Sequence, residues 1–178
     1  MIYLICLAVG VFVLALDQIT KYLAVKLNFN FAVIPELLKF KLSYNTGAAF
    51  SFLSEKNWAM TFFIIITVIT LLAILGFFIY HIIKKRKISK WLAIALSLIF
   101  SGALGNLIDR ILFSKVRDFI FLFYNTKIFP AIFNLADTAL VVGVIMICIK
   151  LLFLDEDALF RKQASKNAEE GNKDDLQS

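Results

Sequence analysis

Histidine, cysteine and proline are scarce in this 178-residue chain, which holds one, two and two of them, respectively. The single histidine, His81, cannot build a metal site by itself, and we expect it to be an ordinary polar residue at the end of a helix. Cys6 and Cys148 fall inside apolar segments, where we expect free thiols packed as small apolar side chains. The sequence therefore predicts no resident metal and no cofactor.

Acidic residues are also few over most of the chain, with only six before residue 155. Four of the six, Asp17, Asp109, Asp118 and Asp137, lie in or beside strongly apolar segments. A carboxylate at membrane depth costs about 2.5–3.5 kcal/mol on insertion scales, so acids in such positions usually mark functional sites. We therefore expect these four aspartates to include the functional site.

Apolar residues, in contrast, dominate the composition. They make up 61% of the chain, against about 45–50% in a soluble domain. A helix needs about 20 apolar residues to cross about 30 Å of hydrocarbon, and four segments qualify, at about 2–23, 58–83, 91–108 and 135–154. The first lacks a basic leader and an A-x-A type cleavage site, so we expect a retained helix. The predicted fold is an all-α membrane protein, a four-helix bundle formed by residues 1–154.

The last 24 residues, 155–178, differ sharply in composition from the rest. They hold seven acids and four basic residues with only scattered apolar ones. Because such a segment cannot form a core, we expect a charged, disordered tail on the cytoplasmic side.

The distribution of lysine and arginine predicts the orientation in the membrane. The connection between the second and third spans carries Lys84, Lys85, Arg86, Lys87 and Lys90 without an acid, which is typical of a cytoplasmic loop. Four spans then place both termini in the cytoplasm and the longer connections, about 28–57 and 109–134, outside. The net charge of +6 thus reflects topology and contact with anionic lipid, and predicts no nucleic-acid partner.

Two segments of the outer connections have the pattern of strands. Residues 38–44 alternate between apolar and polar side chains, as a half-buried strand does. Residues 116–124 are rich in β-branched and aromatic side chains and could pair with the first segment. We expect a small extracytoplasmic β-sheet on the outer membrane face.

Polar side chains recur at helical spacing near the predicted helix ends. Asp17 and Lys21 are four residues apart, so they share one face of a helix. At a rise of about 1.5 Å per residue, Asp17 lies about 24 Å from Met1 and Asp109 lies about 27 Å from Trp91. These groups therefore reach one depth.

Several of these polar and small residues have plain structural interpretations. Asp17 with Lys21, and Asp109 with Arg110, could be ion pairs at helix ends. Gly102 and Gly105 could let helices pack closely. Asn106 and Asn134 could hydrogen-bond between helices, and Asp137 could be an N-cap; these alternatives compete with catalytic roles.

Five short motifs, taken in order, carry more information than any one of them. They are D-x-x-T-K at 17–21, N-T-G-A-A-F at 45–50, G-A-L-G-N-L-I-D-R at 102–110, V-R-D-F at 116–119 and F-N-L-A-D at 133–137. Together they closely resemble the ordered motifs of the lipoprotein signal peptidases, or type II signal peptidases, of bacteria, over about residues 12–150.

The resemblance implies an intramembrane aspartyl endopeptidase of the bacterial cytoplasmic (inner) membrane, acting as a monomer among membrane lipids. Its substrates would be prolipoproteins carrying a diacylglyceryl group on a cysteine, and the signal peptide would be cut just before that cysteine. Carried over motif by motif, Asp118 and Asp137 would be the catalytic dyad near the outer face. Five further residues would line or support the site: Asn45, Gly47, Asn106, Arg110 and Asn134. Structural support would come from Asp17, Lys21, Gly102, Gly105 and Asp109.

Other functions account for the sequence less well. A metalloprotease needs a motif such as H-E-x-x-H, which a single histidine excludes. In a serine protease of rhomboid kind, Ser101 would have to reach His81 from across the membrane. A serine–lysine dyad is harder to exclude. A small proton-coupled membrane carrier or channel component would also use membrane aspartates, but with polar residues along a whole pathway. A structural membrane subunit would leave the five motifs unexplained.

Overall fold

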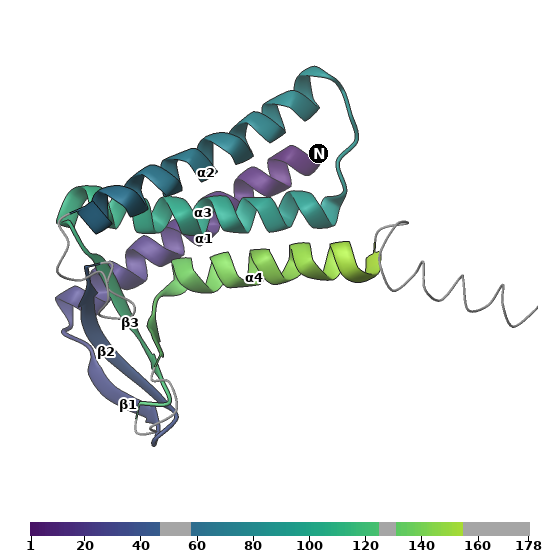
Figure 1. Ribbon diagram of the computed structural model, residues 1–178. Helices are drawn as coiled ribbons and strands as arrows, with labels where there is room; N and C mark the ends of the chain where they lie inside the picture. Colours follow the sequence, from purple (N-terminus) through teal and green to yellow (C-terminus); the bar gives the residue numbers. More distant parts are fainter. Residues whose placement is uncertain (47–57, 125–130, 155–178) are drawn as a thin grey trace, which may run out of the picture.

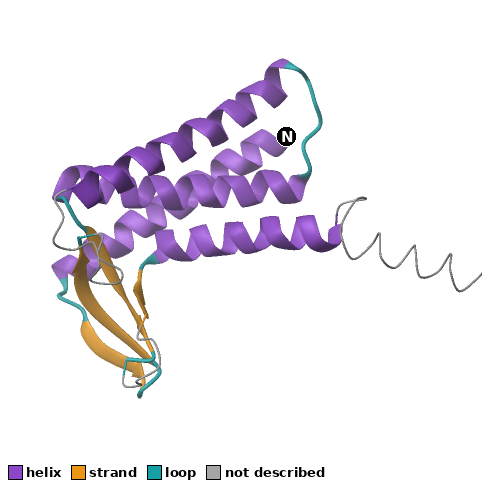
Figure 2. Cartoon of the chain, in the orientation of Figure 1, coloured by secondary structure: helices purple, strands orange, loops and turns teal. Residues whose placement is uncertain are grey.

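Four long helices and one small sheet make up the fold in the computed structural model, which describes residues 1–46, 58–124 and 131–154 (Figures 1 and 2). The helices are α1 (Ile2–Lys26), α2 (Trp58–Ile83), α3 (Lys90–Phe113) and α4 (Leu135–Ile149), the last continued by a π-helical turn, η1 (Lys150–Leu154). All four are long and apolar enough to cross a membrane. The predicted four-helix membrane fold is confirmed. The charged segment 155–178 lies outside the described residues.

The third helix extends five residues past residue 108, where the predicted span ended. It continues through Asp109 and Arg110 and ends at Phe113, where Ser114 adopts the left-handed conformation of a C-cap, with φ of 54°. Charged residues are tolerated there because Asp109 is ion-paired and the Arg110 guanidinium lies over the Phe63 ring, 5.4 Å from its centroid.

Helix α3 is the centre of the bundle. Half of its most apolar 18-residue window is buried inside the protein, against 11% or less for the windows of the other three helices. Small residues on α3 and α4 let these two helices approach closely. A Cβ on Gly102 would meet the carbonyl oxygen of Ala136, and one on Gly143 would lie 2.6 Å from Ile99 Cγ1.

The sheet lies at one end of the bundle, opposite the end that carries the N-terminus and the α2–α3 connection (Figure 1). Its strands follow the order β1 (Asn30–Ile34), β2 (Leu38–Asn45), β3 (Val116–Leu122) and β4 (Ala131–Phe133), and each neighbouring pair is antiparallel. The predicted pairing of segments 38–44 and 116–124 is therefore confirmed. It brings β3, and Asp118 with it, back to the ends of the helices.

The two thiols are free, as expected. Cys6 is buried, whereas Cys148 is exposed, so the expectation that both pack inside the protein is wrong for Cys148.

Candidate active site

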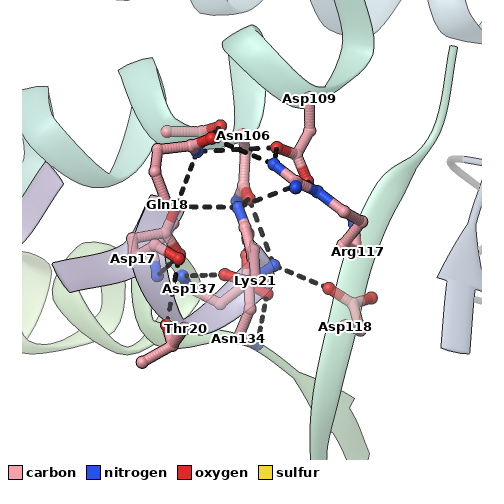
Figure 3. A network of polar contacts seen from close by, with 12 residues as sticks. Asp17, Gln18, Thr20, Lys21, Asn106, Asp109, Arg117, Asp118, Asn134 and Asp137 are labelled. Carbon is pink, nitrogen blue, oxygen red and sulfur yellow. Dashed lines mark hydrogen bonds and ion pairs between the residues drawn. The ribbon is translucent and has the colours of Figure 1, made fainter. Parts of the chain in front are cut away.

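A cluster of buried polar side chains lies where the helix ends meet β3 (Figure 3). It contains seven residues that are each at least 90% buried: Asp17, Lys21, Asn106, Asp109, Arg117, Asp118 and Asn134. Among the described residues, every buried side-chain nitrogen and oxygen has a hydrogen-bond partner. Because a buried polar group without a partner costs about 1–3 kcal/mol, full pairing is what allows such a cluster to persist.

Lys21 lies at the centre of the cluster and is completely buried. Its Nζ lies 2.9 Å from Asp17 Oδ2 and 3.6 Å from Asp109 Oδ2, and it donates to Asn106 Oδ1 at 2.9 Å. Two of these oxygens lie at hydrogen-bond distance from the ammonium group, and the third, at 3.6 Å, is attracted by its charge. The lysine thereby connects α1 to α3.

Asp17 extends the same connection to α4. Its Oδ1 accepts a hydrogen bond from the backbone N–H of Ala136, at 2.9 Å, in the first turn of that helix. Gly105 makes room for the carboxylate, because a Cβ at that position would lie 2.7 Å from Asp17 Oδ2. The predicted ion pair between Asp17 and Lys21 thus exists, and its contacts connect three helices, α1, α3 and α4.

Asp109 pairs with Arg117 of β3, and the expected pair with Arg110 is wrong. The guanidinium holds the carboxylate at two points, Nη2 to Oδ1 at 2.6 Å and Nε to Oδ2 at 3.1 Å, and the Arg117 backbone N–H donates to Oδ2 at 2.9 Å. The chain turns back after Ser114, so the residue eight positions later reaches Asp109. Two carboxylates, Asp17 and Asp109, are therefore balanced by two cations, Lys21 and Arg117.

Asn106 connects this charged network to Asp137. Its Oδ1 accepts from Lys21 Nζ and, at 3.2 Å, from Asn134 Nδ2, while its Nδ2 donates to Asp137 Oδ1 at 2.7 Å. Because an ammonium only donates, the atom that faces Lys21 must be the amide oxygen, which leaves the NH₂ group for the carboxylate. The lysine thus sets the orientation of the amide.

Asn134 contacts both predicted catalytic aspartates. Its Nδ2 donates to Asp118 Oδ1 at 2.6 Å, its Oδ1 accepts from the backbone N–H of Asp137 at 3.0 Å, and its own N–H donates to Asp137 Oδ2 at 3.2 Å. The last two bonds form a capping box, in which Asn134 is the N-cap and Asp137 is the third residue of α4. The expectation that Asp137 itself is the N-cap is wrong.

Asp118 lies on β3 and is 2% exposed. Burial, followed by the nearby charge of Asp137, raises the pKa of Asp118 to about 7, although hydrogen bonds from the side chains of Asn45 and Asn134 oppose the rise. A carboxyl group of this kind exchanges its proton near neutral pH. It has the property required of a general acid or base.

Two further predicted residues lie beside the aspartates, and one is not described. Arg110 is half-buried, and its charge attracts both Asp137 and Asp118. Asn45 ends β2, where it pairs with Val116 of β3. Gly47 lies outside the described residues.

The sequence analysis missed the contribution of Gln18 and Arg117. Gln18 Nε2 donates to Asp17 Oδ2 at 3.1 Å and to the Gly105 carbonyl at 3.2 Å, and its Oε1 accepts from Arg117 Nη2 at 3.0 Å. Both residues directly adjoin a predicted aspartate in the sequence, which is the signal that could have identified them. A metal role has no support here, since the described residues include no group of three His, Cys, Asp or Glu side chains that could hold an ion.

Comparison with known proteins gives a consistent picture. A family model described as "Signal peptidase (SPase) II" matches residues 9–153. Lipoprotein signal peptidases of Staphylococcus aureus, strains JH9 and Newman, are 46% identical over 150 residues, which cover 81% of this chain and 85% of the relative.

Solved structures agree with this. A bacterial membrane enzyme determined by the in meso method at 1.9 Å resolution has a TM-score of 0.69 and 42% identity, covering 84% of this chain and 94% of its own. A second such structure, at 2.3 Å resolution, has a TM-score of 0.69 and 40% identity over 86% of this chain and 93% of its own. With a family model that covers most of its length and relatives this similar, the chain belongs to the signal peptidase II family.

Proposed function

We propose that this protein is an aspartic endopeptidase that removes the signal peptide from diacylglyceryl-modified prolipoproteins and cuts before the lipidated cysteine. The relatives' name supports the substrate, and membership of the family does not support the carrier alternative. One observation carries the catalytic assignment: Asp118 and Asp137, from different elements, both bond to Asn134 at the edge of the helix bundle.

The hydrogen bonds suggest a division of roles between the two carboxyl groups. Asp137 accepts from Asn106 Nδ2 and from the Asn134 N–H and lies in the first turn of α4, where the helix dipole favours negative charge. The pKa of about 7 makes Asp118 the better proton carrier. Two carboxyl groups in one site share a proton, so one is ionised while the other is protonated. We therefore assign Asp137 as the ionised base and Asp118 as the protonated acid.

In the proposed reaction, the Asp137 carboxylate takes a proton from a water molecule while the oxygen of that water attacks the scissile carbonyl carbon. Asp118 donates its proton to the carbonyl oxygen, which gives a tetrahedral diol. Return of a proton from Asp137 to the peptide nitrogen then lets the C–N bond break, and Asp118 recovers its proton from the collapsing diol. No covalent enzyme intermediate forms.

The serine–lysine alternative has no support in the described part of the chain. The buried hydroxyl groups of Ser97 and Ser101 donate to backbone carbonyl oxygens, of Cys6 at 2.5 Å and Ser97 at 2.9 Å. The buried lysine, Lys21, is surrounded by oxygen atoms of Asp17, Asn106 and Asp109, and none of its recorded partners is a serine. That lysine therefore serves as a charge partner and not as a base.

The topology expected from the basic connection supports cleavage at the outer membrane boundary. With the basic α2–α3 connection in the cytoplasm, both termini are cytoplasmic and the dyad lies near the outer face. A lipidated cysteine after a membrane-spanning signal peptide presents its scissile bond at that boundary.

The test is cleavage of a purified diacylglyceryl prolipoprotein by the Asp118→Asn and Asp137→Asn variants. Each should lower kcat by about 10²–10⁴-fold, the typical contribution of a general acid or base, while the precursor still binds. Glu36→Gln, the same carboxyl-to-amide change at an exposed turn between β1 and β2, is the control and should cleave normally. Processing that survives in either aspartate variant contradicts the proposal.

A further inference from the structure

Two adjoining cavities lie outside the candidate active site, and the second of them is at the end of the bundle that carries the N-terminus. The first, of about 410 Å³, runs between α1, α2 and α3, and all but a trace of its exposed wall is apolar. It is lined along its length by residues such as Tyr3, Leu7, Leu14, Leu75 and Phe100. Because all three helices are membrane spans, the cavity faces hydrocarbon.

The second cavity, of about 450 Å³, is basic. It is lined by Lys85, Arg86, Lys87 and Lys90 from the α2–α3 connection and the start of α3, together with His81. None of these four cations forms an ion pair with another described residue. Arg86 also lies over the Tyr80 ring, 5.6 Å from its centroid, but this contact leaves its charge uncompensated. Four positive charges around one hollow attract an anion.

The two cavities share walls. Tyr3 and Ile82 line both, so the basic hollow adjoins the end of the apolar groove that is nearest the N-terminus. A ligand that fits both parts needs an anionic head and a long apolar chain, set at the depth of a membrane surface. Basic pockets between membrane helices commonly bind the head groups of anionic lipids.

We propose that this pair of cavities is a binding site for one anionic glycerophospholipid, whose phosphate head lies among Lys85, Arg86, Lys87 and Lys90 while one acyl chain occupies the groove between α1, α2 and α3. The groove ends at Leu14 on α1, about one helical turn short of Asp17, and at Leu104 on α3, so it adjoins the polar cluster but shares no lining residue with it. The inference goes beyond the proposed peptidase function and is tested without measuring cleavage.

Native mass spectrometry of the purified full chain tests it. The protein is incubated with equal amounts of phosphatidylglycerol and phosphatidylcholine that carry identical acyl chains, and the lipids retained per protein are counted. We expect a clear preference for phosphatidylglycerol. Since a basic residue near an anionic lipid contributes about fivefold in affinity, the double variant Lys85→Gln/Lys87→Gln should lose the preference by about tenfold or more.

Matched variants separate a built site from general charge and from general lipid contact. Lys39→Gln/Lys41→Gln removes two charges in β2 at the opposite end of the molecule and should leave the preference unchanged. Leu7→Trp narrows the groove and should reduce retention, whereas Leu4→Trp, on the same exposed helix but outside the groove, should not.

Four outcomes would overturn the proposal. They are equal retention of both lipids by the parent protein, equal effects of the two lysine pairs, and equal effects of the two tryptophan variants. The fourth is a preference that emerges only when the acids of segment 155–178 are changed to amides, because that segment would then be the natural occupant of the basic cavity.

Discussion

Replacing Lys21 by methionine should destabilise the protein severely, because it leaves buried charge without a partner. The substitution removes the ion pairs with Asp17 and Asp109, at 2.9 and 3.6 Å, and the donor to Asn106 at 2.9 Å. Two fully buried carboxylates would then share one cation, Arg117. Breaking a buried pair on one side typically costs about 3–5 kcal/mol.

The magnitude can be measured by thermal unfolding in detergent. At about 2–4 °C per kcal/mol for a chain of this size, Lys21→Met should lower Tm by about 6–20 °C. Lys26→Met is the matched control, since it makes the same change five residues later on α1 at an exposed position, and Tm should shift little.

A second substitution distinguishes lost charge balance from lost packing. Asp17→Asn combined with Lys21→Met restores the balance, and the Asn oxygen can still accept from the Ala136 N–H. The double variant should therefore be more stable than Lys21→Met alone. The reasoning is refuted if Lys21→Met unfolds at the parent Tm, or if the double variant is less stable than the single one.

Three further changes test the dyad and its support. The proposed acid must be protonated, so kcat/KM for precursor cleavage should fall as pH rises through about 7. Asn45→Leu removes a hydrogen-bond donor to the Asp118 carboxylate, which raises the pKa of Asp118 and should move this fall to higher pH. If the fall stays at the same pH in the variant, another group titrates. Arg117→Lys should lower both Tm and kcat/KM, because an ammonium cannot hold a carboxylate at two points, and a variant with parent values would show that the fork is dispensable. Gly102→Ala should lower Tm, because the added Cβ would meet the backbone of α4. In Gly76→Ala the added Cβ meets nothing within 4 Å, so the free energy of unfolding should stay the same or rise by about 0.5–1 kcal/mol. Equal effects of the two variants would mean that α3 and α4 can separate at no cost.

The elements that sequence analysis located well depend on local pattern. Each span is a run of apolar residues of the length that a bilayer demands, and the strand at 38–44 shows its alternation in the sequence. The shared depth of Asp17 and Asp109 also follows from helical rise alone. Helix ends were less certain, since α3 runs past two charged residues that only tertiary contacts accommodate.

Contacts between residues of different elements could not be predicted from their spacing in the sequence. Asp109 adjoins Arg110 in the sequence, yet successive residues point to different sides of a helix, so its real partner is Arg117 on the returning strand. Gln18 was overlooked for a related reason, because an uncharged residue beside an aspartate has no distinguishing pattern until its four partners converge on it.

The chain by itself determined that four helices cross a membrane and that three of them carry acids to one level, because hydrophobic length and helical rise are properties of contiguous residues. Motif order also pointed to Asp118 and Asp137. Only the tertiary structure decided that one asparagine, Asn134, bonds to both, and that Lys21 sets the amide of Asn106 that faces Asp137. Such contacts join residues far apart in sequence, and they exist only once α1, α3, α4 and β3 have packed together.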